Sequence, residues 1–251
     1  MGLFLRKLFH NYPDLLSEIS SLRAVFMQNM ILLCSLPDKE LNALDLMQQS
    51  RELLAKIARK AYRRDLTSAT RGVISMRLPE TGLYLITSSE TSFDEIKGED
   101  ICLIDATGTM VDKNTSLYLP AETKYHLKSY QVRPDRQAIA HLYPPYISAC
   151  ALQEKPFSLV TDTARNTIKE VLKVQCTECI SRFCGLCACR TDIRTSYAGV
   201  DVLLLKEDGI VTLGSSLENA LELAELAEKT SQETLINGSW KQTNHPINSK
   251  Q

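Results

Sequence analysis

The sequence lacks the charge imbalance expected of a protein that binds nucleic acid. Its 29 Lys and Arg residues are matched by 30 Asp and Glu residues, which gives a formal net charge of −1. Binding to a phosphate backbone requires a basic surplus, so we expect no nucleic-acid partner. The one basic run, ARKAYRR at 58–64, is best explained as the solvated end of a helix.

The sequence also lacks an apolar run long enough to cross a membrane. Its most apolar segment, AVFMQNMILLCSL at 24–36, is too short and contains Gln28 and Asn29. The first residues do not form a secretory signal, because Arg6 and Lys7 interrupt them. We therefore expect a cytoplasmic protein with no membrane partner, whose eight cysteines do not form a disulfide framework.

What remains is the composition of an ordinary globular protein, with 44% apolar and 24% charged residues among 251. We find no internal repeat. We expect an N-terminal helical extension over 1–45, a main domain over 46–236 and a polar, flexible tail over 237–251.

Hydrophobic periodicity predicts helices and strands that alternate along the main domain. Helices are expected at 38–64, 119–131, 161–174 and from Ser215, where Ser215 and Glu218 have the spacing of a capping box. The predicted strands cover 73–78, 83–87, 101–108, 138–142 and, as two strands joined by a turn, 200–214. Because helices alternate with strand hairpins, we expect a three-layer α/β/α domain with a mixed or largely antiparallel central sheet.

The order of these motifs resembles the class II aldolase/adducin family, which includes fuculose-phosphate and ribulose-phosphate aldolases and epimerases. The resemblance extends from about residue 46 to residue 235. It is carried by TRGVISMR, LYLITSS, ICLIDATG, PAETKYH, RPDRQAIAHLYPPY and VLLLKEDGIVTLGSSLENALELAE, in that order. It implies the family's fold, a sugar-phosphate-like ligand and a homo-tetramer.

In working aldolases of this family, three histidines hold a zinc ion that stabilises the enediolate, and a glutamate moves the proton. The resemblance assigns the glutamate to Glu122 and the first ligand to His141. The second and third ligand positions fall on Tyr143 and Asp208. The predicted triad therefore contains one imidazole, one phenol and one carboxylate. We expect weak or no zinc binding at this place, and for any metal that binds there a stronger preference for Mn²⁺ or Mg²⁺ than in the parent family.

Each of these residues also has a structural interpretation. Glu122 stands in the first turn of a predicted helix, where the helix dipole stabilises a negative charge. His141 on its own is typical of a hydrogen-bonded core histidine. Asp208 precedes Gly209, and this pair is common in turns.

The phosphate-binding positions of the family have changed as well. A Gly-Asn pair of the family corresponds to Gly72 and Val73, and a Ser-Ser pair corresponds to residues 120–121, Pro-Ala. Hydroxyl groups remain nearby. The candidate phosphate contacts are Thr70, Gly72, Ser88 and Ser89.

A cysteine cluster that the family lacks follows the predicted helix at 161–174, in an insert over 175–198. Its five members, spaced C-x2-C-x4-C-x2-C-x-C, are Cys176, Cys179, Cys184, Cys187 and Cys189. Two C-x2-C turns can each present two thiolates to one metal ion, and we expect zinc rather than an iron–sulfur cluster. A redox-active C-x2-C pair is the alternative.

Three functions stay open on this sequence. The chain is a metal-dependent sugar-phosphate aldolase or epimerase with altered ligands, a relative with low or no aldolase activity that serves as a binding module, or a metal- or redox-responsive protein. The changed triad favours the second and third functions. The pair Glu122 and His141 keeps the first open.

Overall fold

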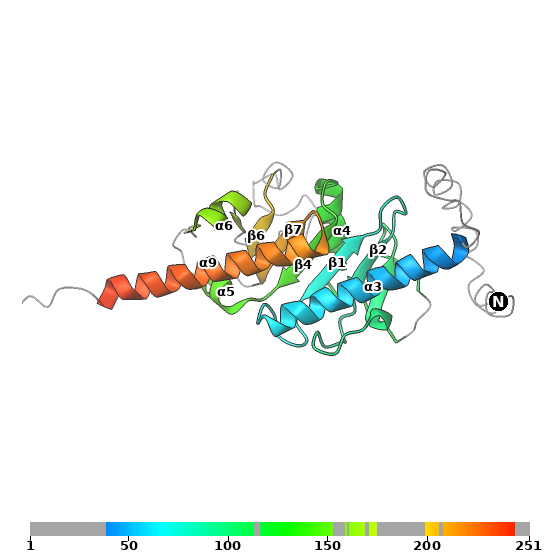
Figure 1. Cartoon of the computed structure of the whole chain (residues 1–251), viewed down its shortest axis with the longest axis horizontal. Helices are drawn as coiled ribbons and strands as arrows, with labels where there is room; N and C mark the ends of the chain where they lie inside the picture. The colour runs from blue at the N-terminus through cyan, green and yellow to red at the C-terminus, as the bar shows by residue number, and fades with distance from the viewer. Residues whose placement is uncertain are drawn as a thin grey trace, which may run out of the picture.

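A seven-stranded, mostly antiparallel sheet organises the computed structural model (Figure 1). The structure describes residues 39–112, 116–152, 159, 161–168, 171–174, 199–205 and 208–243. The strand order is β3-β2-β1-β4-β7-β6-β5, and only β5 and β6 are parallel neighbours among the described strands. The strands are β1 (Val73–Arg77), β2 (Tyr84–Thr87), β3 (Ile101–Ile104), β4 (Ala138–Leu142), β5 (Val171–Val174), β6 (Val202–Leu205) and β7 (Gly209–Gly214).

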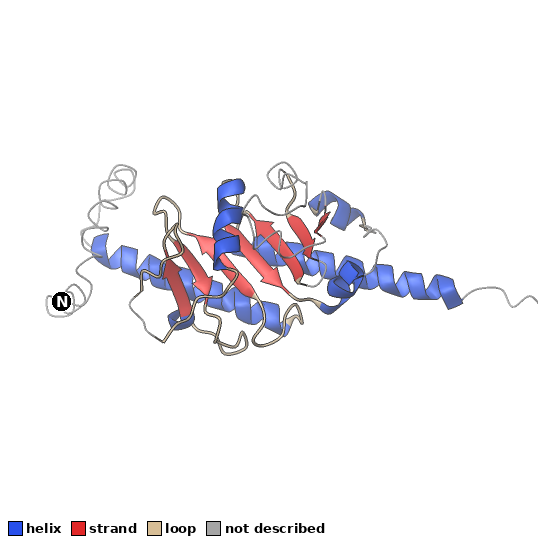
Figure 2. Cartoon of the chain, turned by 180° about the vertical axis from the view of Figure 1, so that it is seen from behind, coloured by secondary structure: helices blue, strands red, loops and turns tan. Residues whose placement is uncertain are grey.

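Helices cover both faces of this sheet, which confirms the expected three-layer arrangement. The helices are α3 (Lys39–Arg63), α4 (Thr123–Val132), α5 (Pro145–Leu152), α6 (Asp162–Thr167) and α9 (Leu217–Thr243), and a 3-10 turn, η1 (Gly98–Asp100), precedes β3. Seen from behind, α4 crosses one face of the sheet, while the long helices α3 and α9 lie against the other (Figure 2).

Strand alternation explains the two layers of core. On β4, Ala138 and Ala140 pack with residues of α3, α5 and α9, and their small side chains let these helices approach the sheet. Ile139 points to the opposite face, where it packs with Tyr125 and Tyr130 of α4. His141 shares the α4 face with Ile139, because residues two apart on a strand point the same way.

Two sequence expectations about elements were wrong. Residues 161–174 do not form one helix: α6 ends at Thr167, and Val171–Val174 form β5, paired in parallel with β6. The helix α9 begins at Leu217, and Ser216, not Ser215, accepts a hydrogen bond from the backbone N–H of Asn219. At the N-terminus of α6, the Thr161 side chain accepts a hydrogen bond from the backbone N–H of Ala164.

The domain limits that we expected fall inside helices. The helix α3 begins at Lys39 and continues through the boundary at 45/46. The backbone of α9 continues to Thr243, beyond the expected start of the tail at 237. In the part of the chain that the structure describes, no helix is both long enough and apolar enough to span a bilayer.

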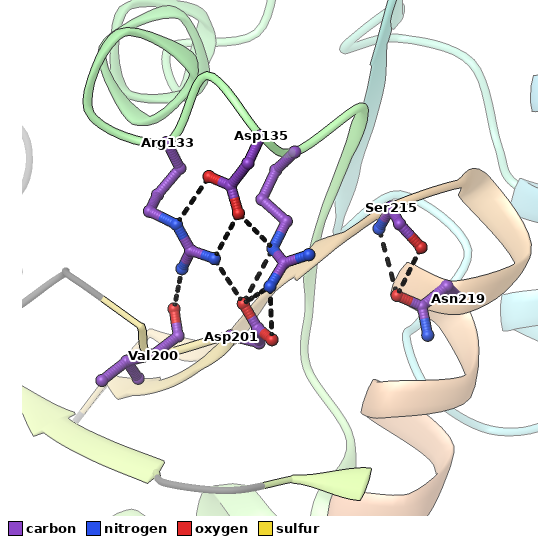
Figure 3. Close-up of polar contacts among 7 residues, drawn as sticks. Arg133, Asp135, Val200, Asp201, Ser215 and Asn219 are labelled. Atoms are coloured by element: carbon purple, nitrogen blue, oxygen red, sulfur yellow. Dashed lines mark hydrogen bonds and ion pairs between the residues drawn. The ribbon is translucent and has the colours of Figure 1, made fainter.

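A charged clasp ties the loop before β4 to the start of β6 (Figure 3). The buried Arg133 donates to both carboxylate oxygens of Asp135, at 3.0 and 2.9 Å, and to Asp201 at 2.9 Å. Arg136 donates to both carboxylate oxygens of Asp201, at 2.9 and 2.8 Å. Arg133 also donates to the carbonyl of Val200, so the clasp explains why the RPDR segment lies where it does.

We expect Asp201→Ala to lower the free energy of unfolding by about 3 kcal/mol, because it leaves the buried Arg133 and its neighbour Arg136 without their shared carboxylate. The matched control is Asp162→Ala, which removes the exposed Asp162–Arg165 pair and should cost about 0.5 kcal/mol or less. Urea unfolding measures the free energy of unfolding of both variants, provided that its dependence on urea concentration has the same slope as in the wild type. Equal losses in the two variants would show that the clasp contributes no more than a surface ion pair.

Candidate functional site

The three ligand positions predicted from the resemblance come together at one end of the sheet. Strand β4 pairs antiparallel with β7, and Leu142 lies opposite Ile210. Residues just after β4 therefore face residues just before β7. This pairing brings Tyr143 next to Asp208, although 65 positions separate them in the sequence.

These three residues are joined by hydrogen bonds and by ring stacking. The Nε2 of His141 lies 2.6 Å from the backbone carbonyl oxygen of Asp208. The hydroxyl of Tyr143 donates to the Asp208 carboxylate at 2.8 Å. The two rings stack with centroids 5.1 Å apart. The Nε2 of His141, the Tyr143 hydroxyl and Asp208 are thus paired with one another, whereas Nδ1 of His141 has no hydrogen-bond partner among the described residues.

An arginine that the sequence did not single out covers this cluster. The guanidinium carbon of Arg71 lies 4.1 Å from the centre of the Tyr143 ring, close enough for a cation–π interaction. The turn carrying Arg71 is held against β4 because the N–H of Tyr143 donates to the carbonyl of Leu66 at 3.0 Å. In the sequence, the position of this arginine directly before Gly72 was the only feature that could have indicated its place at the site.

Gly72 is required at this turn for two reasons. Its φ of +116° is a conformation that residues with a Cβ rarely adopt. A Cβ there would also lie 2.9 Å from the Thr67 hydroxyl oxygen and 3.3 Å from the carbonyl of His141. The backbone of the turn therefore lies closer to β4 than it could with any residue other than glycine at position 72.

Glu122 lies at the same end of the sheet, as the residue that immediately precedes α4. Its side chain is half-buried and makes no capping hydrogen bond to the helix. Burial, the hydrogen bond to Asp208 and the negative charges of Asp208 and Glu122 raise the pKa of Tyr143, while the positive charge of Arg71 lowers it. Tyr143 therefore stays neutral and donates its hydroxyl hydrogen to Asp208.

The candidate phosphate contacts are less well placed. Ser88 is buried, and its hydroxyl bonds to the backbone of Tyr118 as donor to the carbonyl at 3.2 Å. The hydroxyl of Ser89 donates to the same carbonyl at 3.3 Å. Thr70 is exposed on the turn beside Arg71. The serine hydroxyls are thus occupied by the protein's own backbone.

The residues present do not fit the zinc site that the resemblance implies. Such a site needs imidazole nitrogens with free lone pairs. His141 is the one imidazole, and its Nε2 must carry hydrogen to bond to a carbonyl. Its other nitrogen, Nδ1, is buried in a side chain that is 2% exposed. Among the described residues, no group of three His, Cys, Asp or Glu side chains is arranged to hold a metal ion.

Behind the cluster lies a buried polar network between the sheet and α4. The Oγ of Ser75 is 2.7 Å from Nδ1 of His126 and 2.9 Å from the hydroxyl of Tyr130. Burial, with a smaller effect of His141, lowers the pKa of His126 to about 3. His126 is therefore neutral throughout the physiological range.

A comparison with family models matches residues 52–235 to the Class II Aldolase and Adducin N-terminal domain. The chain belongs to this family. It is 30% identical over 175 residues to an L-fuculose phosphate aldolase of Methanococcus vannielii, a match that covers 69% of this chain and 89% of the relative.

Other members of the class II aldolase family resemble the chain but carry different names. A 3-oxo-tetronate 4-phosphate decarboxylase of Haemophilus influenzae is 26% identical over 190 residues, or 74% of this chain and 86% of the relative. The L-fuculose 1-phosphate aldolase structure from Glaciozyma antarctica superposes with a TM-score of 0.65 at 18% identity, covering 77% of this chain and 74% of that one. This last likeness concerns the fold alone. Membership therefore establishes the scaffold and leaves the reaction open.

The cysteine cluster at 176–189 lies outside the described residues, as does Cys34. Cys102 and Cys150, which lie outside the insert, are both buried. Burial raises the pKa of the Cys102 thiol to about 12, so this thiol is unreactive at neutral pH.

His126 makes the stability of the fold depend on pH. An unfolded histidine binds a proton below about pH 6.5, whereas the buried His126 does not until about pH 3. The stability that the fold gains by keeping His126 neutral is therefore complete above about pH 6.5 and is lost as the pH falls toward 3. Between about pH 7 and pH 5 this loss should reach about 2 kcal/mol.

The variant His126→Phe should lose this part of the pH dependence, whatever its stability at neutral pH. Urea unfolding of both proteins at the two pH values measures the difference. If the two proteins lose the same free energy between these pH values, His126 titrates normally in the folded chain.

Proposed function

We propose that this chain keeps the class II aldolase scaffold without efficient zinc-dependent aldol chemistry, and that its cleft binds a small sugar-phosphate-like ligand. One observation supports this most directly: the three ligand positions hold His141, Tyr143 and Asp208, which two hydrogen bonds join to one another. A site whose polar groups already pair with each other gives up these bonds before it can bind a metal.

The chemistry of aldol cleavage explains why this matters. The cut leaves negative charge on a carbonyl oxygen, and a divalent cation stabilises that charge without proton transfer. At this end of the sheet the described cation is the guanidinium of Arg71, spread over the Tyr143 ring, with the carboxylates of Asp208 and Glu122 nearby. We infer ligand binding through Arg71 and the neighbouring turn, with Thr70 at its exposed edge.

A second candidate is a metal-dependent aldolase or epimerase with altered ligands. The observation in its favour is that Glu122 and Asp208 both act on the Tyr143 hydroxyl, which places two carboxylates in one neighbourhood. Carboxylate and phenol oxygens suit Mn²⁺ or Mg²⁺ better than zinc. Assays therefore need to include these ions.

We expect the purified protein, assayed with Zn²⁺, Mn²⁺ or Mg²⁺, to cleave fuculose- and ribulose-type phosphates slowly. Its turnover should be far below about 10 per second, the value for an ordinary enzyme. Restoring the imidazoles by Tyr143→His with Asp208→His should create a site for about one zinc ion per chain. Both proteins are compared with the five cysteines of 176–189 changed to Ser, so that bound zinc reports on this site alone.

Ordinary turnover by the wild-type protein, abolished by Glu122→Gln, would instead establish the second candidate. If the double variant folds and gains no zinc, the alignment of Tyr143 and Asp208 with the ligand positions is wrong. Light scattering of the same sample tests the homo-tetramer that we propose from the family resemblance.

The insert is a separate part of the proposal. Cys176, Cys179, Cys184 and Cys187 bind one zinc ion, with Cys189 as a substitute ligand, in the reducing cytoplasm that we expect. Two C-x2-C turns supply four thiolates, and a short insert with little core of its own would be ordered by these bonds.

Elemental analysis under reducing conditions should find about one zinc per wild-type chain and none after all four cysteines are changed to Ser. The matched control is Cys150→Ala, which removes a buried cysteine outside the insert and should retain the metal. Equal, substoichiometric metal in the wild type and the fourfold variant would identify the cluster as a redox or packing feature.

A further inference from the structure

Two buried imidazoles stand close together in the layer between the sheet and α4. His141 on β4 is 2% exposed, and His126 on α4 is 1% exposed. The strand register sets their spacing: Val73 lies opposite His141, and Ser75 lies opposite Ile139. Ser75 and His141 are therefore diagonal neighbours on one face, about 7–8 Å apart.

This register places the second imidazole as well. His126 lies above Ser75, because the Ser75 Oγ and the His126 Nδ1 are 2.7 Å apart. Both imidazoles also contact the Tyr125 ring, with centroids 5.9 Å from it for His126 and 6.4 Å for His141. The two rings thus occupy adjacent places over the same strands.

Each ring has one nitrogen bonded and one without a protein partner. The Nε2 of His126 and the Nδ1 of His141 are buried and have no hydrogen-bond partner among the described residues. A buried polar atom without a partner costs about 1–3 kcal/mol. A single partner between the neighbouring rings would satisfy both atoms at once.

The hydrogen positions show which partner suits both atoms. The carbonyl of Asp208 can only accept, so His141 carries its hydrogen on Nε2 and presents a lone pair at Nδ1. His126 presents either N–H or a lone pair at Nε2, because the Ser75 hydroxyl can donate to Nδ1 or accept from it. A water molecule suits both cases, since it can accept from His126 or donate to it while donating to His141.

We propose that one ordered water bridges Nε2 of His126 and Nδ1 of His141, and that His126 is thereby a positioning residue for the cleft. The water fixes the His141 ring with its Nε2–H directed at the carbonyl of Asp208. The backbone that carries Asp208 is then tied, through His141 and His126, to Ser75 and Tyr130 in the core. This inference goes beyond the proposed function and does not depend on whether the cleft binds a ligand.

A crystal structure that resolves waters, combined with ¹⁵N NMR of histidine-labelled protein, tests the proposal. We expect a water within about 2.7–3.2 Å of both nitrogens and His141 as the Nε2–H tautomer. The variant His126→Phe removes the bridge, so the water should be lost and the His141 ring should become less ordered, with raised B-factors or a second ring orientation, while the Asp208 carbonyl keeps the hydrogen on Nε2. The matched control Ser75→Ala leaves His126 Nε2 in place and should keep both the water and the single ring orientation.

If His126→Phe does not fold, His126→Gln offers a smaller change, and the wild-type structure and spectrum decide the matter without either variant. An Nδ1–H tautomer of His141, a direct hydrogen bond between the two rings, or well-resolved density without a water at this place would overturn the proposal. A His141 ring that is as well ordered in a folded His126→Phe variant as in the wild type would also overturn it, because His126 would then position nothing.

Discussion

The antiparallel pairing of β4 with both of its neighbours is the constraint on which the core and the candidate site depend. Its register with β7 brings Tyr143 to Asp208, and its register with β1 sets His141 diagonally from Ser75. The alternation of its side chains sends Ala138 and Ala140 to the long helices and His141 to α4. A shift of one residue would exchange these faces and remove the site and the core packing together.

The site also shows how a change of side chain alters chemistry on an unchanged backbone. Three imidazoles would direct lone pairs at a metal cation. A phenol, a carboxylate and an imidazole are joined instead by hydrogen bonds of their own, with Arg71 placing positive charge over the Tyr143 ring. The family's scaffold is therefore compatible with a site whose side chains are bonded to one another, which is the physical basis for separating membership of the family from its reaction.

The sequence predicted most of the strands correctly because their apolar runs are short and bounded by turns. It failed at residues 161–174, where Ile168, Val171 and Leu172 have helical spacing but the last two belong to β5. Only pairing with β6, a contact remote in sequence, decides between helix and strand. Not every leucine of α3 faces the core either, since Leu46 is 54% exposed. Arg71 could not be predicted, since its place over Tyr143 depends on how closely the Gly72 turn approaches β4.

The parallel pairing of β5 with β6 has a consequence for the evolution and engineering of this chain. Val171 lies opposite Val202 and Val174 opposite Leu205, so the chain must return along the length of the strands between the end of β5 and the start of β6. Such a return takes about a dozen residues or more, whereas a hairpin can be closed by two. The parallel pairing therefore requires a crossover connection between β5 and β6, and a tight turn between these strands is incompatible with keeping β5 paired at the edge of the sheet.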